Sequence, residues 1–158
     1  MNYVERLRGV VLKELQSERV GTPLFARLMI EISPDHGHLL DIVTGGIQLT
    51  ESFLQSRVET LLALGDVKSG HLSAQLKLEG GRSGLVTAAL VRNDSPRFDL
   101  LVVGNRGTLR HSPTSDALSG EFVSGDWATK DSPQLATSRC RVLEESLRSG
   151  GTVRLGKE

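Results

Sequence analysis

Two histidines separated by one residue, His36 and His38, have the types and spacing that come nearest to a metal site. Imidazole nitrogens bind zinc and related metals, but a site needs three or four protein ligands. No clear third ligand accompanies the pair, and both histidines fall in a polar loop before a predicted helix. The pattern favours two solvated histidines, and we expect no metal site.

Other catalytic patterns are absent from the sequence. No Ser/His/Asp arrangement has a motif around it, and there is no Cys/His cluster. The segment Gly104-Asn105-Arg106-Gly107 predicts a hairpin turn and not a phosphate-binding loop, because no helix follows it. Cys140 is the single cysteine and excludes an intrachain disulfide; its position in a helical pattern favours a small core residue over a nucleophile.

Length and composition predict one ordinary globular domain over residues 1–158. Lysine and arginine total 19, as do aspartate and glutamate, so the formal net charge is zero. Nucleic-acid binding usually needs a cationic surplus, so we expect no nucleic-acid partner. Aromatic residues make up 4% of the chain, which disfavours a base-stacking or sugar-stacking platform.

The sequence also predicts a compartment. No apolar run approaches the roughly 20 residues that span a bilayer, and the first residues lack the basic region and apolar stretch of a secretory signal. With one cysteine and no disulfide, these features predict a cytoplasmic protein without a membrane partner.

Three helices are predicted from apolar residues spaced three or four apart. They cover about residues 3–17, residues 38–54, and the segment from Ser132-Pro133 to Gly150-Gly151. The middle helix contains Gly45-Gly46, which is about 2 kcal/mol less favourable in a helix than two alanines. Either close packing or a site must offset that penalty.

The remaining apolar segments predict strands of period two. They lie near residues 24–32, from 58 onward, 72–79, 85–91, 98–103, 108–110 and 152–155, and residues 112–130 predict a loop. About five of the strands should form an antiparallel meander. We therefore expect an α+β fold: a largely antiparallel mixed sheet of about six strands, with about three helices on one face.

Two of the predicted strands are apolar on both alternations, over 85–91 and 98–103. Antiparallel strands that face water on one side alternate between apolar and polar residues. Three helices can cover one face of the sheet, and little of the chain is left to cover the other. The pattern thus predicts that the second face packs on another copy of the chain or on another domain.

Five segments, taken in order, resemble motifs of the C-terminal domain of the glucose–fructose oxidoreductase, inositol dehydrogenase and MocA family (Gfo/Idh/MocA). Residues 17–25 resemble its "G-x-x-G-x-P" segment, and residues 39–42 the start of its "G-G-x-L-x-D-x-G-x-H-x-x-D" helix. Residues 76–84 resemble "F-x-N-G-x-x-G", residues 98–109 "G-x-x-G-x-L", and residues 145–155 the closing "S-x-x-x-G-x-x-V-x-L". Their order and spacing extend along nearly the whole chain.

The resemblance implies the family's second domain alone, which holds the substrate side of the cleft and the oligomer-forming sheet. Full-length members also carry a Rossmann domain with a glycine-rich turn and an "E-K-P" segment whose lysine is catalytic, and nothing in this sequence matches either. The resemblance therefore implies that this chain alone binds no cofactor. NAD(P) enters only if a partner chain supplies a Rossmann domain.

Within the helix motif, Asp41 matches the family's first aspartate. Gly45 stands at the position of its proton-transferring histidine, and Gln48 at that of its second aspartate. Neither Thr44 nor Gly46 can replace the histidine, because a hydroxyl has no pKa near neutrality. We name no catalytic residue. Asp41, Gly45, Gln48 and His38 are the candidates for a substrate pocket, although Asp41 can equally be a solvated polar group on the helix.

Three functions remain open at this point. The first is a non-catalytic homologue of the oxidoreductase C-terminal domain, acting as an oligomerising or ligand-binding module, with a homo-oligomer formed through the open sheet face. The second is the substrate-side half of a split oxidoreductase that acts on a sugar-like or other small molecule. The third is a truncated dehydrogenase. The glycine at position 45 favours the first, because a working half should keep its acid–base residue. The sequence names neither a substrate nor an oligomer size.

Overall fold

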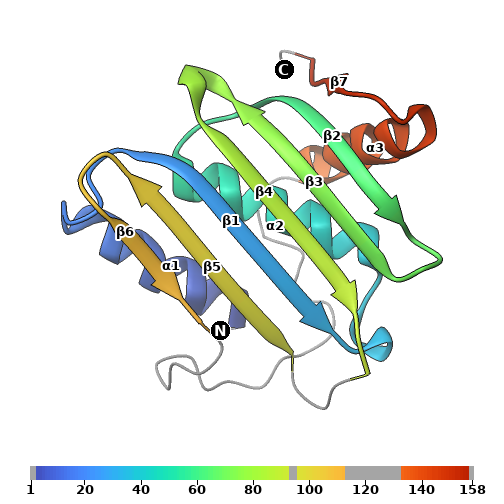
Figure 1. Ribbon diagram of the computed structural model, residues 1–158, viewed down its shortest axis with the longest axis horizontal. Helices are drawn as coiled ribbons and strands as arrows, with labels where there is room; N and C mark the ends of the chain where they lie inside the picture. Colours follow the sequence, from blue (N-terminus) through green and yellow to red (C-terminus); the bar gives the residue numbers. More distant parts are fainter. Residues whose placement is uncertain (1–2, 93–95, 113–132, 157–158) are drawn as a thin grey trace.

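The computed structural model describes residues 3–92, 96–112 and 133–156 as one mixed sheet with three α-helices behind it (Figure 1). The helices are α1 (Tyr3–Gln16), α2 (Leu39–Leu54) and α3 (Pro133–Ser149). The strands are β1 (Pro23–Ile32), β2 (Val58–Asp66), β3 (His71–Leu78), β4 (Ser83–Leu90), β5 (Arg97–Gly104), β6 (Thr108–His111) and β7 (Val153–Arg154). The expected α+β class is confirmed, with seven strands among the described residues where about six were predicted.

The strand order is β6-β5-β1-β4-β3-β2-β7, so the predicted antiparallel meander is wrong at its centre. β1 lies between β4 and β5, where Leu28 pairs with Val86 in parallel and with Leu100 in antiparallel register. Only β2-β3-β4 and the β5-β6 pair keep the meander pattern. The both-sided apolar pattern is found only in β4 and β5, and it does not say which strands are neighbours. Most of the predicted loop at 112–130 lies outside the described residues.

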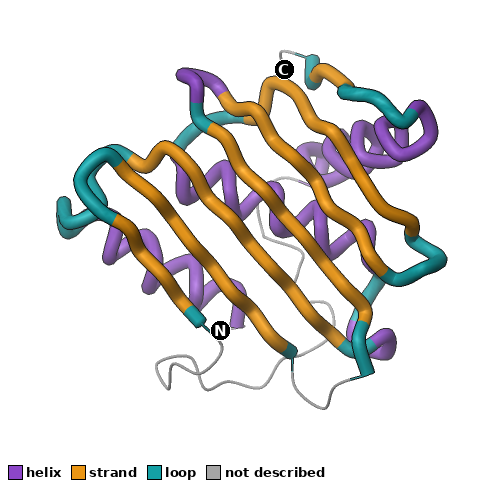
Figure 2. The backbone as a smooth tube through the Cα atoms, in the orientation of Figure 1, coloured by secondary structure: helices purple, strands orange, loops and turns teal. Residues whose placement is uncertain are grey.

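All three helices cover the same face of the sheet, as predicted (Figure 2). α2 packs on β1, β4 and β3, while α3 packs on β2 and on α2. The apolar stripe of α1 (Val4, Leu7, Val11 and Leu15) is buried at 8% exposure or less, in agreement with its spacing. The core between the layers also contains fully buried residues of α2 and of the sheet, among them Ile47, Phe53, Leu28, Leu76 and Phe98.

Close packing explains the glycine in the middle of α2. A Cβ on Gly46 would lie 2.5 Å from Val86 Cγ1 and 3.3 Å from Leu28 Cδ2, so no side chain fits between the helix and the sheet. One turn later the contact is reversed: a Cβ on Gly84 of β4 would lie 2.7 Å from Thr50 Cγ2. The helix and strands approach closely because each side supplies a glycine. Of the two explanations offered for Gly45-Gly46, close packing holds at Gly46.

A pair of glycine substitutions tests this packing. Gly46→Ala should lower the free energy of unfolding by about 1–3 kcal/mol, because the clash with Val86 outweighs the better helix propensity of alanine. Gly9→Ala is the matched control, since an exposed Cβ there meets nothing within 4 Å and should stabilise α1 by up to about 1 kcal/mol. Urea unfolding of both variants measures the two effects. Equal stabilisation by the two substitutions would contradict the close contact.

Beyond the short last strand, a serine of α3 contacts the edge of β2. β7 pairs with Thr60 and Leu61 at the outer edge of β2. Two residues further along β2, the Ala63 N–H donates to Ser146 Oγ of α3 at 2.9 Å. The same hydroxyl donates to the Gly151 carbonyl at 2.6 Å, so the turn after α3 and the edge of β2 share one fully buried side chain.

Candidate functional site

The sequence-predicted pocket residues all lie at the first three turns of α2. His38 is the N-cap residue and Asp41 is in the first turn; both are exposed. Gly45 and Gln48 lie four and seven positions after Asp41, hence on the same side of the helix. Gly45 is buried, and Gln48 is 6% exposed. The helix therefore brings Asp41, Gly45 and Gln48 onto one face, but their role in binding stays a prediction.

This side of α2 meets α3 near Cys140. Burial raises the pKa of the Cys140 thiol, the carboxylates of Glu144 and Asp41 raise it further, and a contact with the Thr44 side chain opposes them. A thiolate is the reactive form of cysteine, so a raised pKa makes the group less nucleophilic. Cys140 is partly buried and is not among the buried core residues, so the predicted core position is met only in part.

Cys140 should therefore react slowly with iodoacetamide at pH 8. We expect alkylation of the folded protein to be several-fold slower than that of the urea-unfolded chain, where the thiol has the pKa of a free cysteine. Mass spectrometry of quenched samples gives both rates. Equal rates would show that neither burial nor the nearby carboxylates restrain the thiol.

The possible metal ligands that the structure describes lie within residues 3–92, 96–112 and 133–156. Within those ranges no group of three or more His, Cys, Asp or Glu side chains could hold an ion. His38 is exposed, and the side chain of His36 lies outside what is described.

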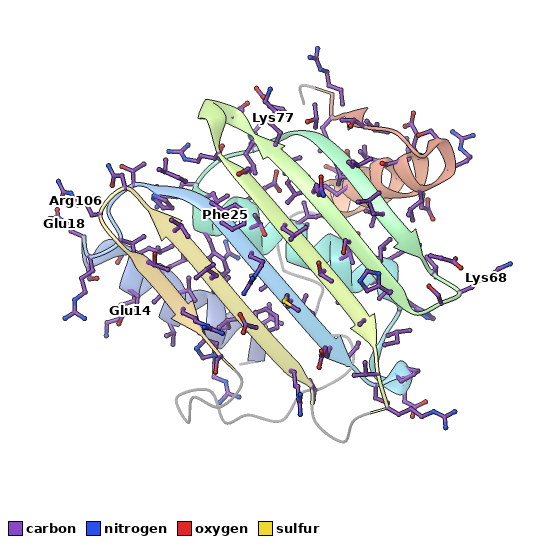
Figure 3. The ribbon with its side chains drawn as sticks, viewed as in Figure 1. Glu14, Glu18, Phe25, Lys68, Lys77 and Arg106 are labelled. Carbon is purple, nitrogen blue, oxygen red and sulfur yellow. The ribbon has the colours of Figure 1, made fainter. Side chains whose placement is uncertain are left out.

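The sheet face away from the helices is the first of two candidate functional surfaces (Figure 3). It mixes polar residues with apolar ones that are partly or fully exposed, the latter being Phe25, Met29, Leu62, Leu64, Leu85, Leu101 and Val103. Met29 is 39% exposed and Leu64 is 45% exposed. Figure 3 shows Phe25 on this face of β1, and no described helix crosses in front of it. We call it the open face.

The charged groups at the centre of the open face form one cluster of both signs, with one carboxylate and two guanidinium groups. Asp99 of β5 lies between two arginines: Arg27 Nη2 is 3.6 Å from Oδ1, and Arg110 Nη2 is 3.5 Å from Oδ2. The Asp99 side chain is only 24% exposed although no helix covers it. Next to this group, Ser73 Oγ and Thr87 Oγ1 share a hydrogen bond of 3.0 Å across β3 and β4. Ser73 and Thr87 are thus hydrogen-bonded within the sheet, whereas Asp99 Oδ1 is buried without a hydrogen-bond partner and meets Arg27 only as an ion pair.

A cavity of about 550 Å³ is the second such feature, and it lies at the far end of α2 from His38 and Asp41. We call it the end pocket. It lies between the starts of β2 and α3, the end of β3, and β7, and none of the predicted pocket residues lines it. The lining residues are Arg57, Val58, Glu59, Thr60, Lys77, Glu79, Ser138, Arg139, Arg154, Leu155 and Gly156.

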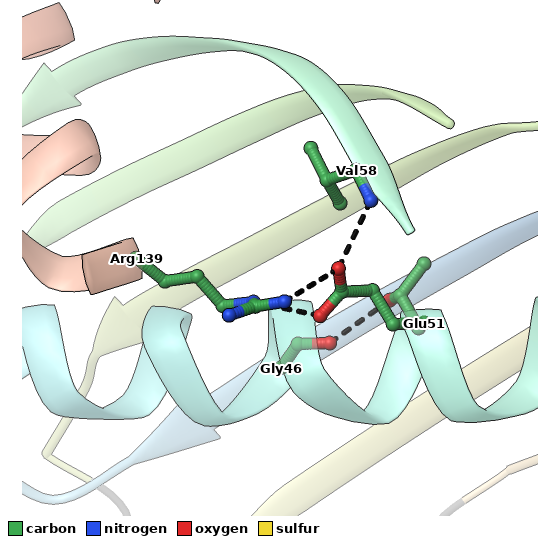
Figure 4. Close-up of polar contacts among 5 residues, drawn as sticks. Gly46, Glu51, Val58 and Arg139 are labelled. Atoms are coloured by element: carbon green, nitrogen blue, oxygen red, sulfur yellow. Dashed lines mark hydrogen bonds and ion pairs between the residues drawn. The ribbon is translucent and has the colours of Figure 1, made fainter. Parts of the chain in front are cut away.

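One lining residue of the end pocket, Arg139, forms a buried ion pair with Glu51 (Figure 4). Arg139 donates from Nε to Glu51 Oε2 at 2.7 Å and from Nη2 to Oε1 at 2.8 Å. Glu51 Oε1 also accepts the Val58 N–H at 2.9 Å, so one carboxylate joins α2, α3 and the start of β2. The two side chains are 9% and 13% exposed. Sequence reasoning missed this pair because 88 positions separate its members.

Comparison with known proteins finds structures of similar fold, but no match in sequence to a family model or to a curated protein. Among solved structures, a scyllo-inositol dehydrogenase from Lactobacillus casei matches with a TM-score of 0.74 at 15% identity, over 98% of this chain and 62% of that one. A myo-inositol 2-dehydrogenase from Lactobacillus plantarum matches with a TM-score of 0.73 at 12% identity, over 98% and 64%. A probable dehydrogenase from Thermotoga maritima matches with a TM-score of 0.68 at 14% identity, over 96% and 62%.

This chain therefore spans less than two thirds of the length of the dehydrogenases that it matches, and nearly all of it takes part in the match. None of the described helices is both long and apolar enough to cross a bilayer. The resemblance seen in the motifs is confirmed at the level of the fold: the chain has the fold of the C-terminal domain of Gfo/Idh/MocA oxidoreductases.

Proposed function

We propose that this chain is an oligomerising module built on the oxidoreductase C-terminal fold, with a second copy of itself on the open face. The open face carries the proposal: its central strands present apolar side chains on the side that no described helix covers. Partly exposed apolar side chains grouped on one sheet face are typical of an interaction site.

A second copy suits the open face better than a strongly charged partner does. The face contains both signs of charge, and its central carboxylate is already paired with Arg27 and Arg110. A surface that carries both signs of charge beside apolar groups can pack on itself with each charge near one of the opposite sign. Homodimers with two-fold symmetry use the same surface twice and are the commonest soluble oligomers.

The proposal does not include catalysis by this chain. Gly45 supplies no side chain where the family resemblance expects an acid–base histidine. Gln48 is an amide that holds no transferable proton near neutral pH, and Asp41 is exposed at the first turn of α2. The proposal therefore rests on the sheet and not on catalytic residues, and a cytoplasmic location stays part of it.

Oligomeric state tests the proposal directly. Light scattering and sedimentation velocity over micromolar concentrations should give a mass of at least twice that of one chain, falling on dilution if the association is weak. A strict monomer throughout that range counts decisively against the open face as a self-association surface.

A split oxidoreductase is the second candidate, and fold likeness to dehydrogenases favours it. One matched structure, of Lactobacillus casei scyllo-inositol dehydrogenase, holds NAD(H) and scyllo-inositol. In this reading a separate Rossmann-domain chain supplies the cofactor, and this chain supplies the substrate side of the cleft for a sugar-like molecule. Calorimetry with NAD(H) and NADP(H) separates the two: heat released only after a co-purified Rossmann partner is added favours the split enzyme. Binding by this chain alone contradicts both candidates.

A further inference from the structure

The end pocket brings together cations from segments far apart in the sequence. Arg57 comes from the loop before β2, Lys77 from the end of β3, and Arg154 from β7. All three side chains are exposed, and within the described residues none of them makes an ion pair. Lys77 is labelled at this end of the sheet in Figure 3. Three unpaired cations around one cavity stand out in a chain whose formal net charge is zero.

Arg139 also lines the pocket, and its guanidinium is held in a fixed orientation by an ion pair with Glu51. Glu51 itself is not a lining residue. Two hydrogen bonds to the Glu51 carboxylate fix the plane of the Arg139 guanidinium, and the same carboxylate accepts a hydrogen bond from the Val58 N–H. A buried ion pair stabilises a fold less than well-packed apolar residues of the same volume often do. A role in presenting positive charge to the cavity accounts for its position.

The other lining groups limit what can bind. Glu59 and Glu79 are exposed carboxylates on the same cavity, and Thr60 and Ser138 add hydroxyl groups. A bare anion would satisfy the cations but would meet two carboxylates. A molecule that carries both an oxyanion and hydroxyl groups can satisfy both sets, since its hydroxyls donate to the carboxylates. The volume of about 550 Å³ is in the usual range for small-molecule sites.

We propose that the end pocket binds a small hydroxylated molecule bearing a phosphate or a carboxylate group. The oxyanion lies against Arg57, Arg154 and Lys77, because arginine binds both kinds of oxyanion through paired hydrogen bonds. The hydroxyl groups face Glu59 and Glu79. This inference does not rest on the oligomer proposed above, because every lining residue comes from one chain.

Calorimetry at low salt with three related probes tests the proposal. Glycerol 3-phosphate and glycerate carry the two oxyanions, and glycerol carries neither. We expect one or both acids to bind and glycerol to give no heat. Tighter binding of the phosphate identifies a phosphate site, and tighter binding of glycerate identifies a carboxylate site. Equal heats for all three probes, or no binding of either acid at millimolar concentration, overturn the proposal.

Substitutions then locate the binding. Arg154→Gln and Arg57→Gln should each weaken the binding of the better acid about tenfold, the usual effect of losing one charge-assisted hydrogen bond. Arg141→Gln is the matched control, an exposed arginine of α3 that does not line the pocket, and should leave the affinity unchanged. Binding that survives both pocket substitutions places the ligand elsewhere and overturns the assignment. A variant that is monomeric through a change on the open face should bind as the wild type does, so the two proposals can fail separately.

Discussion

Arg139→Met should lower the free energy of unfolding by about 3–5 kcal/mol, one of the largest effects that a single substitution can have in this chain. Methionine fills a similar volume but leaves the Glu51 carboxylate buried at 13% exposure without its two charged hydrogen bonds. The charge then has only the Val58 N–H as a described partner. Urea unfolding followed by circular dichroism measures the loss, with the midpoint read against wild type.

The double variant Glu51→Leu with Arg139→Met separates the value of the pair from the penalty of an unpaired charge. We expect the double variant to be much more stable than Arg139→Met alone, because apolar residues of similar volume replace buried ion pairs with little loss. Some loss should remain, since the Val58 N–H loses its acceptor. A single variant less than about 1 kcal/mol below wild type would contradict this account, since that is the range of a solvent-exposed pair.

Met29→Lys should dissociate the proposed oligomer with little effect on the fold of one chain. Met29 is 39% exposed on the open face and lies opposite Asp99 of β5 and Thr87 of β4. In a single chain the lysine can extend into water or toward the Asp99 carboxylate. Between two copies its charge is desolvated, and two-fold symmetry makes this happen twice. A combined loss of about 4 kcal/mol corresponds to a dissociation constant about a thousandfold weaker.

Val10→Lys is the matched control for that experiment. Val10 is an apolar side chain of α1 with nearly the same exposure, 42%, in the helical layer behind the sheet. Both variants gain one positive charge, so general repulsion between chains is equal in the two. Sedimentation velocity should give a monomer for Met29→Lys and the wild-type mass for Val10→Lys. Dissociation by both, or by Val10→Lys alone, would move the interface away from the open face.

The sequence predicted the elements of this fold better than their arrangement. Helical spacing predicted a helix over residues 3–17, and the structure has α1 at Tyr3–Gln16. The prediction was accurate because Val4, Leu7 and Val11 all face the core from one side of the helix. Strand neighbours were harder to predict, because β4 and β5 carry the same both-sided apolar pattern and follow each other in the sequence, which favoured pairing them directly. Which strand pairs with which depends on the three-dimensional path of the chain through α2, and no residue type in the strands specifies that path.

The open face and the end pocket also differ in how far they could be predicted from the sequence. The open face could be predicted because its signal is local: apolar residues on both alternations within single strands. The end pocket could not, because Arg57, Lys77 and Arg154 each look like an ordinary solvated charge beside a strand. Only the pairing of β2 with both β3 and β7 brings them around one cavity. The candidates on α2 that the motif suggested remain predictions. Asp41 is exposed, and Gln48, seven positions later on the same side of the helix, is buried.

The central position of β1 also bears on how the chain reaches this structure. β2, β3 and β4 are joined by short turns, as are β5 and β6, so these two groups can pair as soon as they are synthesised. β1 is made before all of them, yet both of its neighbours come later, and Leu28 finds Val86 and Leu100 only after most of the chain exists. Pairing between distant segments forms slowly because loop closure opposes it. We therefore expect joining of the two groups through β1 to be the rate-limiting step of folding, with the first strand made among the last to be paired.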